Sequence, residues 1–552
     1  MRTQMICSSD PAPMKDERLR ISWILAKTPG FAIASGLVWR KREVRVPFMI
    51  NSLVHAQRAW IVALVVCLAA SFANAQGDKE NQVSTEGLLN AIHQAGDKQE
   101  KLSLIRKLGE MGGSESTAAA LNILEKGNSE ERLAAADGLS KALVFEAIHP
   151  IVRLVRSEDD PDRQTQEIGF ALRLLDANQP NRRKDDAVAN ISSLLSGATR
   201  IEDRKRILAS LAAEDNRCEF GYVVAQAYMS YPGLESQATK VADELARDLG
   251  VKPQKLPYWG EYEGVCGGKK SRAMVVPEKH EDQNHFIYRI RVIGDGIDTT
   301  MEGRPDKEGV SIDSNGWKGE IRDDTLQAKN GDRVIKMKRH ERKSPTLGQK
   351  PPAGAIVLLP LGANKPADMD AWANATWRLL PDGSMEVGTG YNTTKQEFAS
   401  CRIHIEFAEP FMPEEHGQGR GNSGVYLMGR YEIQVLDSFG DNPDKGNCGG
   451  IYNNATPLVR DVQLPPLHWQ TYDIFFRPPE FDANGSVIRP ACFEKVLHNG
   501  VLIHENIQVL KPTPSSLWND QKPAAPLALQ DHDHGNPVRF RNIWIVPEGD
   551  RQ

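Results

Sequence analysis

Cysteine is scarce in this chain, and neither a long hydrophobic run nor an excess of basic residues is present. Only 7 of its 552 residues are cysteine, and none is spaced as C-x-x-C. This excludes a zinc ribbon and a disulfide framework as the basis of the fold. Lys and Arg number 68 against 73 Asp and Glu, a net charge of −5. The sequence therefore lacks the basic footprint of a nucleic-acid-binding protein, and we expect no nucleic-acid partner.

The longest apolar run covers residues 59–70, AWIVALVVCLAA, and is too short to span a bilayer, where about 20 residues are needed. Arg58 precedes it and Ala73-Asn74-Ala75 follows it, as in a secretory signal with its cleavage site. We predict that residues 1–75 are a signal region, with the true start at Met49 and cleavage after Ala75. An uncleaved anchor is the alternative. The mature protein is then expected to be exported, periplasmic or secreted, without stable membrane insertion.

Residues 84–250 contain short amphipathic helical patterns separated by Gly- or Asp-containing breaks. Leu102, Ile105 and Leu108, for example, recur at the spacing of one helix face. Short helices in series, none able to bury its apolar stripe alone, are typical of a helical-repeat stack. The segment resembles HEAT/armadillo-type repeats, and a compact bundle is the alternative. We expect it to bind a protein partner or to position the rest of the chain, and to be dispensable for catalysis because its polar residues resemble solvated helix faces.

Beyond residue 250 the chain changes to β-type runs separated by turns. Residues 255–355 predict a small β-rich module without a chemical signature. From 370 to 547 the strand signal is stronger, and Asn499-Gly500 marks a two-residue hairpin. Strands in series without helices between them indicate an antiparallel β-sandwich. The expected fold is multidomain, with an all-α N-terminal part followed by an all-β part.

Two of the predicted strands, 401–407 and 425–435, alternate between apolar and polar side chains. The apolar odd positions should face the core, because successive side chains on a strand point to opposite faces. The even positions carry Arg402, His404 and Glu406 on the first strand, and Tyr426, Arg430, Glu432 and Gln434 on the second. Planar hydrogen-bonding groups beside an aromatic ring are what a sugar site needs. A solvated outer face would show the same alternation.

Asp437 extends the second strand to the spacing E-x-Q-x-x-D, which begins at Glu432 and includes Gln434. A regular strand would turn Asp437 toward the core, and a single bulge would return it to the polar face. The spacing resembles the E-x-D-x-x-E signature of laminarinase-like glucanases, whose bulged strand lines the sugar cleft. Gln434 cannot ionise, so the paired carboxylates of a retaining glycosidase are not reproduced.

Several longer runs are specific enough to compare with known families. They are GQGRGNSGVYLMGRYEIQVLDSFG (417–440), CGGIYNNATP (448–457), LPPLHWQTYDIFFRPPEFD (464–482), VLHNGVLIHEN (496–506) and HGNPVRFRNIWI (534–545). They resemble the 3-keto-disaccharide hydrolase domain, formerly a domain of unknown function. The resemblance covers about residues 370–547 and implies a concanavalin A-like lectin/glucanase fold, a jelly roll. The helices and the 255–355 module lie outside it. An extra Asp-His pair leaves open whether His532 or His534 takes the family position.

The resemblance implies cleavage of glycosides whose sugar carries a ketone at C3, by hydrolysis or by β-elimination and hydration. A C3 ketone acidifies the C2 proton, so the reaction needs a base, a donor for the enolate oxygen and an acid for the leaving oxygen. The catalytic candidates are Glu432, Asp437 and His534, with Glu432 or a histidine as the base and Asp437 or His534 as the acid. Arg430 or Asn422 would be the donor. The remaining substrate-binding candidates are His404, Glu406, Tyr426 and Gln434.

No cofactor or resident metal is expected. Asp437, Asp441 and Asp444 lie close in sequence and could hold a divalent cation such as calcium; an acidic solvated loop is the other interpretation. Two further functions remain open. One is a non-catalytic, lectin-like carbohydrate-binding protein, because a fold does not settle function. The other is a structural protein that binds a partner through its helices.

Overall fold

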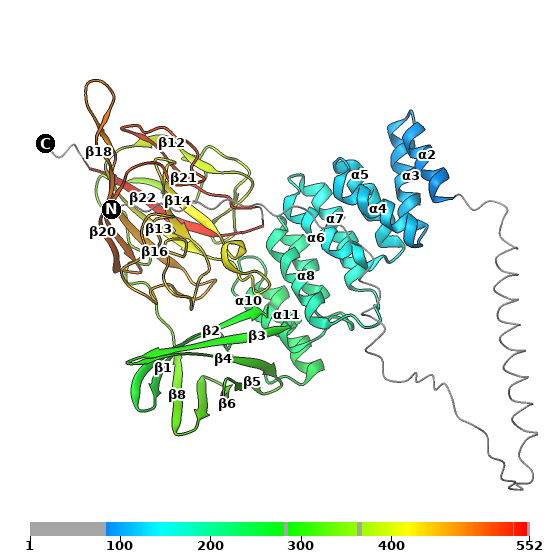
Figure 1. Ribbon diagram of the computed structural model, residues 1–552, viewed down its shortest axis with the longest axis horizontal. Helices are drawn as coiled ribbons and strands as arrows, with labels where there is room; N and C mark the ends of the chain where they lie inside the picture. Colours follow the sequence, from blue (N-terminus) through cyan, green and yellow to red (C-terminus); the bar gives the residue numbers. More distant parts are fainter. Residues whose placement is uncertain (1–83, 255, 281–284, 362–366, 534, 549–552) are drawn as a thin grey trace, which may run out of the picture. The chain divides into compact units, whose positions relative to one another are not determined.

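The computed structural model describes residues 84–254, 256–280, 285–361, 367–533 and 535–548 (Figure 1). Residues Val83–Gln552 form one compact unit. The predicted signal region and its cleavage site lie outside the described residues. None of the described helices is long and apolar enough to cross a membrane.

Ten α-helices make up the N-terminal part of the described chain. They are α2 Thr85–Gln94, α3 Lys98–Glu110, α4 Ser114–Lys126, α5 Ser129–Lys141, α6 Ile148–Ser157, α7 Pro161–Leu175, α8 Lys184–Gly197, α9 Ile201–Ser210, α10 Glu219–Tyr228 and α11 Glu235–Leu249, with a short 3-10 helix η1 Phe145–Ala147 before α6. The breaks visible in the sequence are helix caps. Asn128 forms a capping box at the start of α5, and Asp160 caps α7 ahead of Pro161. Such caps satisfy backbone N–H groups that have no partner inside the helix.

The helices pack against neighbours one or two places along the chain, as α3 does with α4 and α5, and α6 with α7 and α8. The helices therefore follow one another side by side along the chain (Figure 1). Leu102, Ile105 and Leu108, the predicted apolar stripe of α3, are buried. Each stripe is covered by neighbouring helices, as a series of short amphipathic helices requires.

Eight antiparallel strands follow and close into a barrel, because β1 pairs with both β2 and β8. The strands are β1 Gly260–Cys266, β2 Lys269–Lys279, β3 Phe286–Gly294, β4 Ile297–Asp306, β5 Gly309–Ser314, β6 Trp317–Arg322, β7 Thr325–Asn330 and β8 Arg333–His340. Asn315-Gly316, with positive φ at both residues, forms the two-residue link between β5 and β6. The sequence predicted β-structure here but not closure, which depends on pairing between the first and the last strand.

The remaining chain forms two larger antiparallel sheets. Its elements are β9 Ile356–Leu359, β10 Arg378–Leu379, β11 Met385–Glu386, β12 Asn392–Phe398, β13 Cys401–Ala408, the 3-10 helix η2 Gly417–Gly419, β14 Ser423–Leu427, β15 Tyr431–Val435, β16 Gln470–Arg477, β17 Glu480–Phe481, β18 Val487–Arg489, β19 Ala491–His498, β20 Val501–Val509, β21 Ala525–Leu529 and β22 Arg539–Pro547. An eight-stranded sheet has the order β10-β11-β22-β13-β16-β19-β20, with β9 paired to β22, and a four-stranded sheet has the order β12-β21-β14-β15. One apolar core takes residues from both sheets, including Phe407 and Ile433. The two sheets thus enclose this core between them.

The predicted strand 425–435 is two strands in the structure. β14 and β15 are joined by a tight turn at Met428 and Gly429, which have φ angles of 57° and 62°. Across the hairpin Val425 lies opposite Ile433, and Tyr426 lies opposite Glu432. Because the hairpin pairs odd with odd and even with even residues, the predicted division into a core face and a polar face holds although the single strand was wrong.

Buried contacts join the helices to both β parts. Phe220 of α10 stacks on Phe286 of β3 with ring centroids 3.8 Å apart. Arg204 of α9 pairs with Glu386 of β11, and their side chains are 1% and 0% exposed. The expectation that the polar residues of the helices are solvated is therefore wrong for Arg204. Packing against the β parts hides this charge from water.

The cysteines of the described residues form no disulfide. They are Cys218, Cys266, Cys401, Cys448 and Cys492, and all five are buried. They come from helix, barrel and both larger sheets or their loops. This agrees with a fold held together by apolar cores rather than by cross-links.

Candidate functional site

The structure divides the sequence-predicted site residues between two sheets. β13, with His404 and Glu406, belongs to the eight-stranded sheet, whereas β14 and β15, with Tyr426, Glu432 and Gln434, belong to the four-stranded sheet. Odd-numbered residues of all three strands lie in the shared core. The even-numbered residues therefore face away from the core on opposite sides, and the two sets cannot meet in one site.

His404 and Glu406 belong to a buried polar network on the outer side of the larger sheet, in which His404 Nε2 has no hydrogen-bond partner among the described residues. His404 Nδ1 lies 3.0 Å from Asp473 Oδ1, and Glu406 accepts hydrogen bonds from Asn542 Nδ2 at 2.8 Å and Gly348 N at 2.6 Å. Burial raises the pKa of Glu406, but hydrogen bonds from His404, Asn542 and Gly348 outweigh it and leave that pKa lowered. Both side chains are 0% exposed, so this network has the features of a structural site.

Tyr426 and Glu432 lie side by side on the outer face of the smaller sheet. Tyr426 donates its hydroxyl hydrogen to Glu432 Oε2 at 2.7 Å. Gln530 Nε2 donates to the hydroxyl of Tyr426 at 3.2 Å and to that of Tyr391 at 3.0 Å. A Cβ on Gly424 would lie 2.5 Å from Glu432 Oε1 and 2.8 Å from the Tyr426 ring. Only glycine leaves room for both side chains at this position.

The surroundings of Glu432 change its acidity strongly. Burial raises the pKa of its carboxyl to about 8, although the hydrogen bond from Tyr426 acts in the opposite direction. Burial, reinforced by the neighbouring Glu432 charge, also raises the pKa of Tyr426 well above its ordinary value. At neutral pH the phenol therefore keeps its proton as a donor, whereas Glu432 can both hold and release one.

Amide side chains complete this outer face. Asn422 Nδ2 and Gln434 Nε2 both donate to Gln418 Oε1, at 3.1 and 3.2 Å. Asn422 Oδ1, Gln434 Oε1 and Gln530 Oε1 are buried and have no hydrogen-bond partner among the described residues. Buried acceptors without donors are costly. Sugar hydroxyl groups are donors that would satisfy them.

Arg430 lies at the end of the hairpin turn, apart from this network. Its Nε donates to the carbonyl of Asp520 at 2.6 Å, and its Nη1 donates to the carbonyl of Met428 at 2.7 Å. The Asp520 carboxylate pairs with Nη2, and the guanidinium carbon lies 5.0 Å from the centre of the Trp518 ring. Nε and Nη2 of Arg430 thus anchor the loop that contains Asp520, and Nη1 holds the hairpin turn at Met428.

Asp437 follows β15 but does not lie beside Glu432. Its Oδ2 accepts a hydrogen bond from Arg420 Nε at 2.7 Å, and its N–H donates to the Arg420 carbonyl at 3.1 Å. The barrel holds the next residues of the loop, because Arg289 and Arg291 of β3 donate to the carbonyl of Gly440 at 3.3 and 3.2 Å. Asp437 therefore acts as the counter-ion of Arg420 at the junction with the barrel.

The aspartates considered as a cation site are tied to separate partners. Asp441 Oδ1 lies 3.0 Å from Arg289 Nη2, whereas Asp444 accepts from a backbone N–H of its own loop at 2.9 Å. In the part of the chain that the structure describes, no group of three or more His, Cys, Asp or Glu side chains is placed to hold a metal ion.

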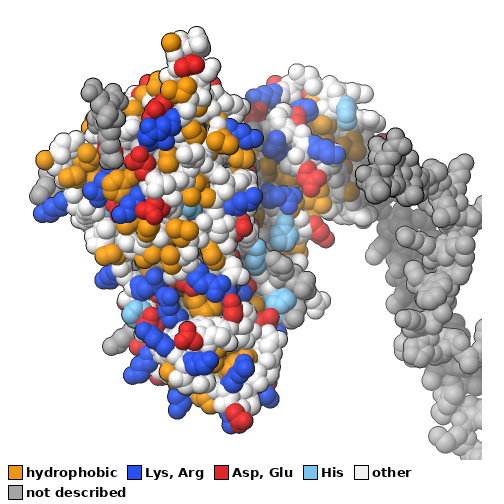
Figure 2. All heavy atoms as spheres, turned by 60° about the vertical axis from the view of Figure 1, so that its left-hand side comes forward, with side chains coloured by type: hydrophobic (Ala, Val, Ile, Leu, Met, Phe, Trp, Pro, Cys, Tyr) orange, Lys and Arg blue, Asp and Glu red, His pale blue; other side chains and the backbone are white. Residues whose placement is uncertain are grey.

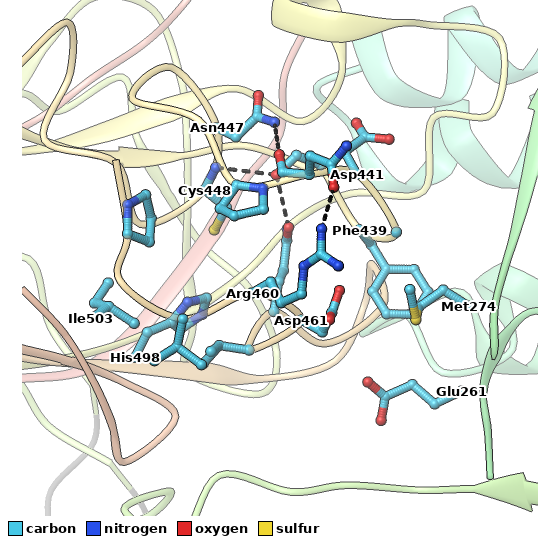
Figure 3. A pocket seen from close by; sticks show the side chains of 18 residues that line it. Glu261, Met274, Phe439, Asp441, Asn447, Cys448, Arg460, Asp461, His498 and Ile503 are labelled. Atoms are coloured by element: carbon cyan, nitrogen blue, oxygen red, sulfur yellow. Dashed lines mark hydrogen bonds between the residues drawn. The ribbon is translucent and has the colours of Figure 1, made fainter. Parts of the chain in front are cut away.

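A narrow cleft of 40 Å³ is lined by Glu261 and Met274 of the barrel and by Phe439, Arg460 and His498 of the following chain (Figure 3). Arg460 Nη2 donates to Asn442 Oδ1 at 2.7 Å across it. A ligand pocket usually measures about 300–1,000 Å³. This cleft has room for about one water molecule and is too small for a sugar ring.

His534 lies outside the described residues. Its neighbours do approach the network, because Asn536 Oδ1 accepts from Asn422 N at 3.1 Å. Asn536 Nδ2 in turn donates to the carbonyl of His532 at 2.9 Å. Asn536 is thus placed next to Asn422 and joins it to His532.

Sequence reasoning missed several members of the network. Gln530 follows APLAL in β21, and the alternation of that strand could have placed it on the polar face. Tyr391 lies in a loop and Gln418 in the three-residue helix η2, where no periodicity points to them. Glu409 was also missed: it is 0% exposed, and burial together with the Asp437 charge raises its pKa to about 8. Its position directly after β13 carried no signal.

Comparison with known protein families gives a match to the C-terminal part of the chain. A family model described as 3-keto-alpha-glucoside-1,2-lyase-like domain matches residues 308–546. The matched region begins inside the barrel rather than near residue 370. Part of the 255–355 module therefore lies within the matched region, although the whole module was expected to lie outside it. No curated protein matches the chain.

Two crystal structures of candidate glycosyl hydrolases from Parabacteroides distasonis ATCC 8503 are similar to part of the chain. The first is 33% identical to this chain in sequence, and the aligned region covers 36% of this chain and 84% of that structure's chain, with a TM-score of 0.32. The second is 18% identical, and the aligned region covers 35% of this chain and 99% of that structure's chain, with a TM-score of 0.25.

Proposed function

The C-terminal part of this chain belongs to the family of 3-keto-alpha-glucoside-1,2-lyase-like domains, and we propose on this basis that the protein is an enzyme that cleaves glycosides whose sugar carries a ketone at C3. A base removes the C2 proton, and the C3 oxygen takes up the negative charge as an enolate. The C1–O bond then breaks, and the leaving oxygen receives a proton. Addition of water to the resulting double bond would make the net reaction a hydrolysis.

Glu432 is the residue that fits the base. Its carboxylate is more basic than an exposed one, because burial raises its pKa to about 8. Tyr426 holds Oε2 through a hydrogen bond of 2.7 Å, and we assign proton transfer to Oε1. Once Glu432 has taken up the proton, its carboxyl is neutral, and burial favours this neutral form over the charged carboxylate.

Substrate binding is assigned to the amides beside Glu432. The buried oxygens of Asn422, Gln434 and Gln530 would accept hydrogen bonds from sugar hydroxyl groups. Of the two donors considered for the enolate oxygen, Arg430 is already paired with Asp520, so Asn422 Nδ2 remains. Asn422 would exchange its contact with Gln418, an exposed residue of η2, for the enolate oxygen. Asp437 is proposed to position Arg420 rather than to transfer a proton. His534 remains the proposed acid for the leaving oxygen.

The observation that carries this proposal is the buried Tyr426–Glu432 contact within the matched region. It is tested by incubating the purified protein with methyl 3-keto-α-glucoside and with methyl α-glucoside, and by following release of methanol. Turnover of the keto sugar alone supports the enzyme. Binding of either sugar without turnover would favour a lectin-like protein, for which the same buried acceptors would serve. Absence of both would favour a structural role with a protein partner at the helices.

We also propose the finer description of the fold. The two sheets around one core are taken as a concanavalin A-like jelly roll. The helices are taken as HEAT-like repeats, because they pack on neighbours one or two places along the chain. We expect no nucleic-acid partner. Basic and acidic side chains are interspersed on the face shown in Figure 2 rather than separated by sign.

Export with cleavage after Ala75 is proposed from the sequence alone, on the apolar run 59–70 and the A-x-A site that follows it. N-terminal sequencing of the protein recovered outside the cytoplasm tests it. A first residue of Gln76 is expected, and an N-terminus upstream of the apolar run would contradict cleavage.

A further inference from the structure

A cavity of 230 Å³ lies between the barrel and the following β part, beside the proposed active site. It is lined by Glu278, Arg289, His416, Gly417, Arg420, Asp437 and Asp441. Glu278 belongs to β2 and Arg289 to β3, so the barrel supplies one wall. A water molecule occupies about 30 Å³ in the liquid. The cavity therefore has room for several hydroxyl groups of a ligand.

The charges in this cavity nearly cancel. Arg289 Nε donates to both oxygens of Glu278, at 3.1 and 2.9 Å, and its Nη2 lies 3.0 Å from Asp441. Arg420 Nε donates to Asp437 at 2.7 Å. An anion such as phosphate would meet three carboxylates, and a metal ion would meet two guanidinium groups. A neutral ligand rich in hydroxyl groups fits this balance, since it can donate to the carboxylates and accept from the arginines.

Arg420 provides an independent sign of a ligand. It is 4% exposed, and its Nη2 has no hydrogen-bond partner within the described part of the chain. A buried charged donor without an acceptor is unfavourable. A sugar hydroxyl oxygen in the cavity that Arg420 lines would supply the acceptor.

The cavity adjoins the proposed active site through one short turn. Gly417 lines the cavity, and the next residue, Gln418, contacts Asn422 and Gln434 of the amide network. A ligand that binds at Glu432 could therefore extend past Gln418 toward the barrel.

We propose that this cavity is a second sugar subsite, which binds a neutral hexose unit of the substrate through its hydroxyl groups and is built in part by the barrel. The inference rests on the proposed function and narrows its substrate to disaccharides or longer glycosides. None of the residues lining the cavity is Trp, Tyr or Phe, so the unit would be recognised by hydrogen bonds and not by stacking. The barrel is then part of the substrate site rather than a separate module.

The test compares two substrates in three variants. KM is measured for a 3-keto-disaccharide and for methyl 3-keto-α-glucoside with Glu278→Gln, Asp441→Asn and a control, Glu320→Gln. Glu320 lies on β6 outside the cavity and is 52% exposed. Each cavity variant should raise the ratio of the two KM values roughly tenfold, since a hydrogen bond to a charged group is lost. The control should keep the wild-type ratio.

An unchanged ratio in both cavity variants, with folding verified by thermal denaturation, would overturn the subsite. A protein without turnover of any 3-keto-glycoside would overturn the proposed function, and the subsite would then be tested by calorimetry with maltose and glucose. Tighter binding of maltose than of glucose in the wild type, lost in Glu278→Gln, supports the subsite. Equal binding of the two sugars in both proteins refutes it.

Discussion

Arg204 of α9 and Glu386 of β11, 182 residues apart in the chain, form a buried bidentate ion pair with two contacts of 3.0 Å. The Tyr231 hydroxyl and the Arg378 guanidinium also donate to Glu386. Glu386 is thus surrounded by donors from the helices and from the sheet that follows. A charge buried in this way is stable only while its partners remain in place.

Replacing Arg204 with methionine should therefore destabilise the protein by about 3–5 kcal/mol, because Glu386 would keep a buried charge with one partner fewer. Urea denaturation measures this change in the free energy of unfolding. Arg200→Gln is the matched control on the same helical region: its pair with Asp162 is exposed on both sides (46% and 81%). The control should change stability by less than about 1 kcal/mol. Equal changes in the free energy of unfolding for the two substitutions would contradict a stabilising role of the buried Arg204–Glu386 pair.

Residues 251–552 expressed alone should fail to fold as a monomer. Removing the helices would expose Phe286, which Phe220 covers, and would leave Glu386 without Arg204. Size-exclusion chromatography and circular dichroism of this fragment check the expectation. A folded, monomeric fragment would restore the interpretation of the helices as a dispensable segment.

Glu432→Gln should lower kcat for a 3-keto-glycoside about 10²–10⁴-fold with little change in substrate binding. Glutamine keeps the shape of the side chain and can still accept from Tyr426, but it cannot take up a proton. Glu397→Gln, at an exposed position of the same sheet, is the control. Full activity of Glu432→Gln would show that Glu432 is not the base, and the outer face of this sheet would then only bind substrate or contact solvent.

The activity of the wild-type protein should rise with pH up to about 8, because Glu432 must lose its proton to act as a base and burial raises its pKa to about 8. A pH profile of kcat/KM measures this rise. A flat profile across pH 6–9 would contradict the assignment of the base.

Stability should change with pH in the opposite direction. The folded state keeps a proton on Glu432 up to about pH 8, whereas an ordinary carboxyl loses it near 4.5. Between these values the folded state binds more protons, so stability falls as pH rises through this window. Burial raises the pKa of Glu167 and Glu409 to about 8 as well. The difference between wild type and Glu432→Gln isolates the contribution of Glu432, and identical pH dependence of the two would refute it.

Treatment with EDTA should leave turnover unchanged. Asp437 and Asp441 are paired with Arg420 and Arg289, and Asp444 is exposed, so these carboxylates do not converge. Activity is measured before and after dialysis against the chelator, and again after calcium is added. Loss on dialysis with recovery on calcium would show that the loop binds a cation in solution.

Local patterns were sufficient for much of the fold. The alternation in 401–407 and 425–435 identified Ile403, Ile405, Val425 and Ile433 as core residues, and all four are buried. The breaks between the helical patterns separated the helices, and the structure shows caps at two of them, Asn128 and Asp160. Such caps are local, because their side chains act on backbone groups two or three residues away. Met428 and Gly429 were wrongly assigned to a strand. The left-handed backbone of this turn gives little signal in the sequence, because the residues around it are mostly apolar.

The sequence by itself determined which residues are apolar in alternation, where helices begin, and the motifs that match the family; each depends on neighbours within a few positions. The tertiary structure alone decided that β1 and β8 close a barrel, that His404 and Glu432 lie on opposite outer faces, and that Arg204 is buried against Glu386. These outcomes depend on strand order and on packing between segments far apart in the chain. Period-two alternation shows that a side chain faces away from the core, but not to which sheet its strand belongs.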